Sequence, residues 1–166
     1  DVPVPFYRAT TGPTGRFLRV NPAFVRLFDA DSAEQLLGLD ICSLYVDGAR
    51  RAHFSNTLIE EGEVFRHELH MRTVTGREIW TADTAFRHLD KNGEPVIDGV
   101  LEDITRRREL EAELSYQARY DKLTDLANRR HCESVLHDET ERSDRYGQPL
   151  SALMIDVDHF KRVNDT

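Results

Sequence analysis

The chain has 166 residues, enough for one large domain or for one complete domain and part of a second. Hydrophobic residues make up 39% and charged residues 31%, which is typical of a globular protein that folds in water. The formal net charge is -8, so the phosphate backbone of a nucleic acid is excluded as an expected partner.

The 2 cysteines, Cys42 and Cys132, lie far apart in the sequence, which favours a reducing compartment over a disulfide framework. No apolar stretch approaches the roughly 20 residues that a membrane-spanning helix needs. No signal peptide is evident at the start of the sequence. We therefore expect a cytoplasmic location and no membrane segment in this chain.

The first part of the chain alternates between β-like and helical signals. Two short β-like runs, 6–10 and 16–20, flank the turn-forming segment TTGPTG and predict a hairpin. Asn21 can cap a short helix, and Ser32 can cap a second one through a capping-box spacing. A longer helix is predicted over 47–62, with these residues as its expected core positions: Ala52, Leu58 and Ile59.

Three strands are predicted next, over 64–73, 77–89 and 95–105, with an Asn-Gly hairpin signal before the third. Alternation in the first strand assigns one face to Phe65, His67, Leu69 and Met71. Alternation in the second assigns one face to Trp80, Ala82, Thr84 and Phe86. Residues 1–105 therefore predict an α+β domain, in which helices cover one face of a five-stranded antiparallel sheet.

A charged helix without glycine or proline is predicted over 106–120. Leu110 and Leu114 lie four residues apart and form a thin apolar stripe. A helix with so little to bury often pairs with its own copy, which suggests a homodimer. A solvated linker helix is the alternative, and the short stripe leaves it open.

Acidic residues follow an apolar run near the end of the chain. The run 150–155 shows no alternation, which predicts a strand covered on both faces. Asp156 and Asp158 stand where this strand ends, and ligands bind beyond the carboxyl ends of strands in open α/β sheets. Carboxylates there are hard oxygen donors for Mg²⁺. The alternative, that both aspartates cap a following helix, stays open.

The segments DKLTDLANRR and LMIDVDHFKRVNDT resemble the first third of a GGDEF domain, the diguanylate cyclase family. That family joins two GTP molecules into cyclic di-GMP, with Mg²⁺ as cofactor. The resemblance implies that Asp156 binds the metal ion through its carboxylate and Val157 through its carbonyl. It also implies that Phe160 and Lys161 lie along the phosphates and that Asn164 contacts guanine.

This resemblance covers residues 121–166, and the GG(D/E)EF segment itself is not among them. We therefore expect the chain by itself to be catalytically incomplete, as the start of an α/β GGDEF domain. The alternative is a signalling or scaffold protein whose GGDEF domain binds GTP or a partner without catalysis.

Residues 1–105 resemble a PAS sensor domain. The resemblance rests on GRFLRVNPAFVRLF, SAEQLLG, TGREIW and GVLEDITRRRELEAEL, and the D-I-T at Asp103–Thr105 is its most specific part. It implies a domain that senses a small ligand, a cofactor or a partner protein and signals through the helix 106–120. The function expected is a sensory module that controls a diguanylate cyclase.

The sensor ligand is not identified by the sequence. His67, on an apolar strand face, could contact a ligand together with Trp80 and Thr84, or could be a core histidine with a neighbouring partner. Haem is not expected, because the family's ligating histidine lies earlier on the long helix than His53. Covalent flavin is not expected, because Cys42 lacks the N-C-R-F-L-Q context, while flavin bound without a covalent bond stays open.

Overall fold

The computed structural model describes residues 4–12, 14–156 and 158. The chain divides into two compact units, Asp1–Glu111 and Ala112–Thr166. The helix that leaves the sheet crosses the boundary between these units. The domain limits expected from the sequence, at 105 and 120, stay predictions.

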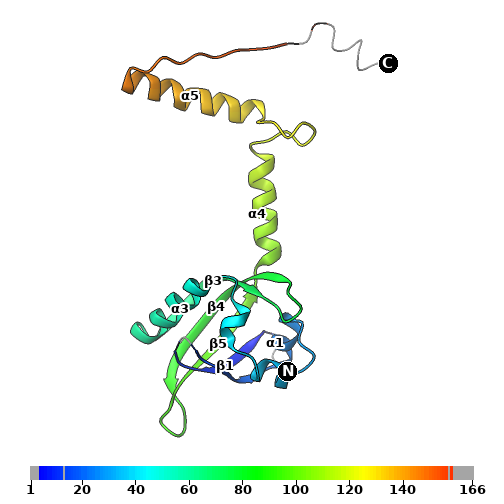
Figure 1. Cartoon of the computed structure of the whole chain (residues 1–166), viewed down its shortest axis with the longest axis vertical. Helices are drawn as coiled ribbons and strands as arrows, with labels where there is room; N and C mark the ends of the chain where they lie inside the picture. Colours follow the sequence, from blue (N-terminus) through cyan, green and yellow to red (C-terminus); the bar gives the residue numbers. More distant parts are fainter. Residues whose placement is uncertain (1–3, 13, 157, 159–166) are drawn as a thin grey trace, which may run out of the picture. The chain divides into compact units, whose positions relative to one another are not determined.

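Five strands of the first unit form one antiparallel sheet in the order β2-β1-β5-β4-β3 (Figure 1). The first and last strands of the unit, β1 and β5, lie side by side. The connection from β2 to β3 contains the helices. The α+β prediction is confirmed. The strands are β1 Phe6–Thr10, β2 Phe17–Val20, β3 Glu63–Arg72, β4 Glu78–Leu89 and β5 Pro95–Asp103.

Polar side chains set the starts of the helices in this connection. Asn21 Oδ1 accepts a hydrogen bond from the backbone N–H of Phe24 at 2.9 Å. Asp47 Oδ1 accepts one from the N–H of Ala49 at 2.9 Å, and Ser32 caps the helix between them. The capping predictions for Asn21 and Ser32 are therefore confirmed. The connection contains α1 Pro22–Leu27, α2 Ala33–Leu37, the 3₁₀ helix η1 Ile41–Leu44 and α3 Gly48–Glu60.

The core lies between the helices and one face of the sheet. Leu58 of α3 is fully buried, as predicted, but Ala52 is exposed and Ile59 is 44% exposed. The prediction for Ala52 and Ile59 was wrong because α3 turns a different stripe toward the sheet. That stripe consists of Arg51, Phe54, Ser55 and Leu58.

The predicted alternation of β3 is broken by a bulge. The pairing of β3 with β4 shifts between Val64 and His67, and Arg66 has a φ of 48°. An extra residue in one strand reverses the facing of its neighbours. Val64 is therefore buried and Phe65 is 80% exposed, so the prediction that Phe65 shares the face of Leu69 was wrong.

The helix α4, Thr105–Gln117, starts directly after β5, and α5, Arg129–Tyr146, belongs to the second unit. Gly147 ends α5 with a φ of 64°, a conformation that glycine adopts without strain. Residues 150–155 form no strand, and Met154 is 96% exposed. The strand prediction was wrong for the described chain, because no described strand pairs with this run. In the part of the chain that the structure describes, no helix is both long and apolar enough to span a bilayer.

Gly99 of β5 makes room for a core aromatic ring. It pairs with Tyr7 of β1, and a Cβ atom at this position would overlap the Tyr7 ring. The ring therefore packs across the glycine, in the manner of aromatic rescue in sheets.

We predict that Gly99→Ala destabilises the folded chain by about 1–3 kcal/mol, because Tyr7 must leave its position. The control is Gly48→Ala at the first residue of α3, where an added Cβ meets nothing within 4 Å. Urea unfolding followed by circular dichroism measures both variants. A Gly99→Ala midpoint equal to the wild-type midpoint would contradict the packing described.

Candidate functional site

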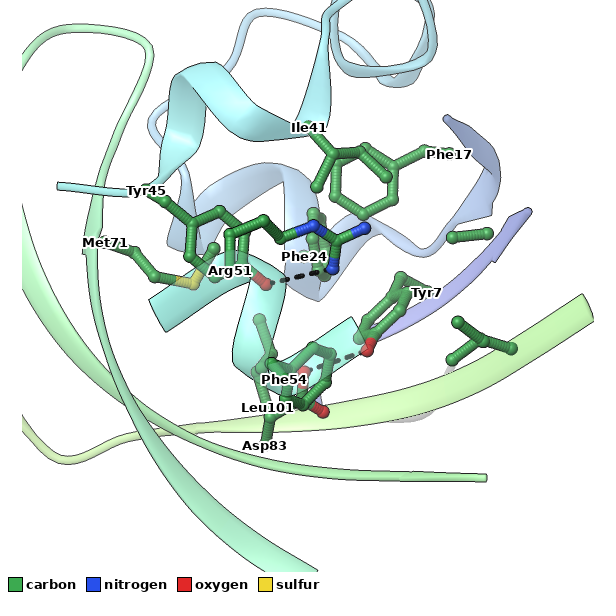
Figure 2. A pocket seen from close by; sticks show the side chains of 12 residues that line it. Tyr7, Phe17, Phe24, Ile41, Tyr45, Arg51, Phe54, Met71, Asp83 and Leu101 are labelled. Carbon is green, nitrogen blue, oxygen red and sulfur yellow. Dashed lines mark hydrogen bonds between the residues drawn. The ribbon is translucent and has the colours of Figure 1, made fainter. Parts of the chain in front are cut away.

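A cavity lies between the helices and the inner face of the sheet (Figure 2). Its unfilled space is about 350 Å³, part of it open to solvent, and the centre of a water molecule could occupy about 20 Å³ of it. The smaller volume corresponds to about one water molecule. The lining is Tyr7, Ala9, Phe17, Phe24, Ile41, Tyr45, Arg51, Phe54, Met71, Asp83, Ile97 and Leu101.

A buried carboxyl group from β4 is the most unusual part of this lining. The Tyr7 hydroxyl donates a hydrogen bond to Asp83 Oδ2 at 2.8 Å, as Figure 2 shows. Asp83 Oδ1 has no hydrogen-bond partner among the described residues. Burial raises the pKa of Asp83 to about 7, although the Tyr7 hydrogen bond and the charge of Arg51 act in the opposite direction. Burial and the nearby Asp83 also raise the pKa of Tyr7 well above its ordinary value.

A buried guanidinium from α3 faces the same cavity. Arg51 donates to the Tyr45 hydroxyl at 3.4 Å and to the Gly12 carbonyl at 3.2 Å. Cζ of the Arg51 guanidinium lies 5.3 Å from the centroid of the Tyr45 ring and 5.9 Å from the centroid of the Phe54 ring, within cation–π range. Nε of Arg51 has no partner among the described residues. Burial raises the pKa of Tyr45 to about 12 despite the nearby positive charge.

The structure does not bring His67, Trp80 and Thr84 into one pocket. His67 pairs with Asp83 across β3 and β4 and therefore faces the inner side of the sheet. Its ring centroid lies 5.5 Å from that of Phe54, and burial lowers its pKa, with His53 and Arg50 adding to the effect. None of the three residues belongs to the cavity lining.

Trp80 and Thr84 occupy the opposite, outer face of the sheet, because the buried residues of β4 are the alternate ones. Thr84 Oγ1 accepts a hydrogen bond from the N–H of Arg66 at 3.1 Å, which supports the bulge in β3. Tyr7, Arg51 and Asp83 were not predicted from the sequence. The period of two could have placed Asp83 on the same face of β4 as Ile79 and Ala85.

The first turn of α4 is anchored on this outer face, within the first unit. The Arg108 guanidinium lies 3.9 Å from the Trp80 ring centroid, and His70 stacks on the same tryptophan at 4.4 Å. Glu68 forms ion pairs with Arg107 at 2.8 Å and with Arg108 at 3.2 Å. These contacts fix the direction in which α4 leaves the sheet.

The D-I-T motif supplies the hydrogen bonds at this anchor. The Trp80 N–H donates to Thr105 Oγ1 at 2.9 Å, and the Ile104 N–H donates to the Trp80 carbonyl at 2.9 Å. Asp103 Oδ1 accepts from the N–H of Thr105, the first residue of α4, at 2.9 Å. The motif therefore connects β4 to the helix through Trp80.

The two residues considered for cofactor chemistry lie outside the cavity lining. His53 is exposed on α3, and its ring centroid lies 6.0 Å from that of His67. Cys42 lies in η1, where burial and Asp40 raise the pKa of its thiol. The expectations about haem and covalent flavin stay predictions.

Of the residues assigned to nucleotide binding, only Asp156 is described, and it is exposed. The positions predicted for the metal-binding carbonyl, the phosphate contacts and the guanine contact lie outside the described residues: Val157, Phe160, Lys161 and Asn164. Within residues 4–12, 14–156 and 158, no group of three or more histidine, cysteine, aspartate or glutamate residues could hold a metal ion. The nucleotide-site assignments therefore stay predictions.

Family models match both parts of the chain. Residues 5–106 match the model described as PAS domain, and residues 118–166 match the model described as diguanylate cyclase, GGDEF domain. A five-stranded antiparallel sheet with helices on one face, followed by an exit helix, is the arrangement of the PAS fold. The chain belongs to the PAS domain family, and its PAS domain is followed by the start of a GGDEF domain.

The curated relatives are longer than this chain. A diguanylate cyclase of Vibrio cholerae is 30% identical over 161 residues, which cover 91% of this chain and 48% of the relative. The diguanylate cyclase DosC of Escherichia coli is 47% identical over 64 residues, which cover 38% of this chain and 14% of the relative. The chain thus spans less than half the length of these relatives.

Solved structures share the fold of the first unit. The structure of an RNA-binding light-oxygen-voltage receptor has a TM-score of 0.58 and 24% identity, covering 71% of this chain and 34% of that chain. A PAS domain from Colwellia psychrerythraea has a TM-score of 0.54 and 21% identity, covering 64% of this chain and 90% of that chain. Both support the PAS fold.

We predict that Asp83 gives the folded chain a specific pH dependence. Its folded pKa of about 7 lies above the ordinary value of 3.8, so the folded state holds the proton more tightly. The stability that this proton provides is complete below the ordinary pKa, and it decreases as the pH rises toward 7. The slope approaches about 1.4 kcal/mol per pH unit within that window.

Urea unfolding of the wild type and of Asp83→Asn between pH 4 and about pH 8.5 measures this contribution. The unfolding free energy of the wild type minus that of the variant should fall with rising pH and become constant about one unit above the folded pKa of about 7. Asp144→Asn, at an exposed position of α5, is the control and should leave the slope unchanged. A pH-independent difference would show that Asp83 does not hold its proton in the folded state.

We predict that Arg108→Gln loosens the anchor of α4 on the sheet. Trp80 is the only tryptophan of the chain, so its fluorescence reports on this contact. Emission should shift to longer wavelength and acrylamide quenching should increase, with a stability loss of about 1 kcal/mol or less. Arg106→Gln is the control, because Arg106 pairs with Glu109 at 3.4 Å. Equal spectra for the two variants would argue against the anchor.

Proposed function

We propose that this chain is the sensory part of a protein that makes cyclic di-GMP, in which the PAS domain controls a diguanylate cyclase. The observation that carries the proposal is the order of the two matches, a PAS domain over 5–106 followed by a GGDEF start over 118–166. The Vibrio cholerae diguanylate cyclase is similar to this chain over both parts, which supports the same pairing.

The contacts of β4 support control of the exit helix by the cavity. Asp83 lines the cavity on one face of β4, and Trp80 holds the first turn of α4 on the other face. The two residues are three positions apart in a strand that is paired on both sides. A change at Asp83 that shifts β4 would therefore act on the support of α4.

The GGDEF start would supply part of a GTP site. We assign the metal ion to the Asp156 carboxylate and the Val157 carbonyl, the phosphates to Phe160 and Lys161, and guanine to Asn164. Mg²⁺, when bound, would neutralise charge on the triphosphate. The reaction joins two GTP molecules by attack of each ribose 3′-hydroxyl on the α-phosphate of the other, with release of pyrophosphate. The remaining parts of that site are not among residues 121–166.

We propose a cytoplasmic homodimer, because condensation of two GTP molecules requires two facing GGDEF domains. The apolar stripe of α4 is available for pairing, since Leu110 is 41% exposed and Leu114 is 66% exposed. A stripe this thin gives weak pairing, which suits a helix whose register a sensor domain adjusts.

The test uses a full-length protein that contains a complete GGDEF domain, incubated with GTP and Mg²⁺. We predict that the wild type forms cyclic di-GMP and that Asp156→Ala lowers the rate by several orders of magnitude without unfolding the protein. Chromatography of the product measures the rate. Asp138→Ala, at an exposed position of α5, is the matched control and should retain activity.

A full-length wild type that binds GTP without forming cyclic di-GMP would favour the scaffold alternative. Near-normal turnover in Asp156→Ala would show that the metal assignment is wrong.

A further inference from the structure

The inner cavity brings together a buried cation and a buried carboxyl group whose hydrogen bonding is incomplete. Arg51 is 4% exposed and Asp83 is 2% exposed, and both line the cavity. Arg51 Nε and Asp83 Oδ1 have no hydrogen-bond partner among the described residues. A buried polar atom without a hydrogen-bond partner is destabilising, so a ligand that forms hydrogen bonds with both atoms would bind favourably.

The charge of Arg51 selects an anion. Two arginines of the sheet have carboxylate partners: Arg8 pairs with Asp98 at 2.6 Å, and Arg66 pairs with Glu102 at 2.7 Å. No described carboxylate forms an ion pair with Arg51, whose polar contacts include the Tyr45 hydroxyl, the Gly12 carbonyl and the Cys42 thiol. While Asp83 is protonated, the buried charge of Arg51 has no counter-ion among the described residues, and a bound anion would supply the missing partner.

The rest of the lining limits the anion to one charge and a small apolar body. Phe17, Phe24, Ile41 and Leu101 provide apolar walls. A single guanidinium can neutralise one negative charge, so a dicarboxylate or phosphate would keep an uncompensated charge in the cavity. The space of about 20 Å³ for a water centre admits a small group before side chains have to move.

We propose that the inner cavity binds a short-chain monocarboxylate, whose carboxylate pairs with Arg51 and accepts a hydrogen bond from Asp83. The apolar end of the ligand packs against the apolar walls of the cavity. Met71, which also lines the cavity, has the most adaptable side chain of the lining. This inference rests on the proposed function, in which the cavity is the sensing site.

Binding is coupled to a proton on Asp83. A second carboxylate beside Asp83 favours its neutral form, which can donate the hydrogen bond. The titratable and charged groups that face Asp83 are Tyr7 of β1, Tyr45, Arg51 of α3 and His67 of β3. Burial lowers the pKa of His67, so this histidine is neutral at pH 7.5. Asp83 therefore takes up the proton, and the affinity falls by up to about tenfold per pH unit above pH 7.

Isothermal titration calorimetry of the 166-residue chain with sodium butyrate tests the proposal. Butyramide and succinate are the comparison probes, the first without charge and the second with two charges. We expect one butyrate to bind per chain. Butyramide and succinate should each bind at least about tenfold more weakly than butyrate. Butyrate should bind more weakly at pH 8 than at pH 6. Buffers of different ionisation heat measure the proton taken up at pH 7.5.

Three variants separate the roles of the cavity residues. Arg51→Met keeps much of the side-chain volume and should lower butyrate affinity at least about tenfold. Asp83→Asn should still bind butyrate, without the proton uptake. Arg50→Met is the matched control on the same helix, because Arg50 is exposed and pairs with Asp47 at 3.7 Å. Circular dichroism establishes whether each variant is folded. If Arg51→Met does not fold, the pH dependence of butyrate binding to the wild type tests the proposal.

Absence of butyrate binding at millimolar concentration would overturn the proposal, as would equal affinity for butyrate and butyramide. Unchanged affinity in a folded Arg51→Met, or proton uptake retained in Asp83→Asn, would overturn the assigned contacts. If butyrate fails to bind while Asp156→Ala removes cyclase activity from the full-length protein, the ligand class is wrong and the proposed function stands.

Discussion

The period of two along β4 is the constraint on which the other features of the first unit depend. Ile79, Thr81, Asp83 and Ala85 face the core, and the residues between them face outward. Because β3 and β5 are paired on either side, β4 cannot rotate about its own axis. One strand therefore carries a cavity residue on one face and the support of the exit helix on the other.

Burial of the polar groups that line the cavity carries an unfavourable desolvation free energy. An aspartate, a tyrosine hydroxyl and an arginine are buried among phenylalanine, isoleucine and leucine side chains. The hydrogen bond between Tyr7 and Asp83 offsets part of the desolvation cost, and the aromatic rings beside Arg51 offset another part. An apolar replacement of similar volume would satisfy the packing at lower cost. Packing alone therefore does not account for the burial of charge in this core.

Two different kinds of contact occur on the two faces of the PAS sheet. On the inner side, neutral and charged groups meet in a largely buried environment, where a single proton changes the balance of charge. On the outer side, Arg108, Trp80 and Glu68 form a partly exposed cluster whose individual contacts are weak.

Local chemistry was enough to locate most elements from the sequence. The caps at Asn21 and Ser32 and the turn at Asn92–Gly93 act between residues close in the chain, and each stands where the pattern predicted it. The motif around Asp156 was recognised for the same reason, because its residues are nearly contiguous.

Only tertiary structure decided which stripe of α3 is buried, where β3 bulges at Phe65, and that Trp80 faces away from the cavity. It also assembled the cavity, since Tyr7 and Asp83 are separated by 76 positions and meet only when β1 and β4 flank β5. Such contacts depend on how strands are ordered in the sheet, and side-chain periodicity along one segment contains no information about that order.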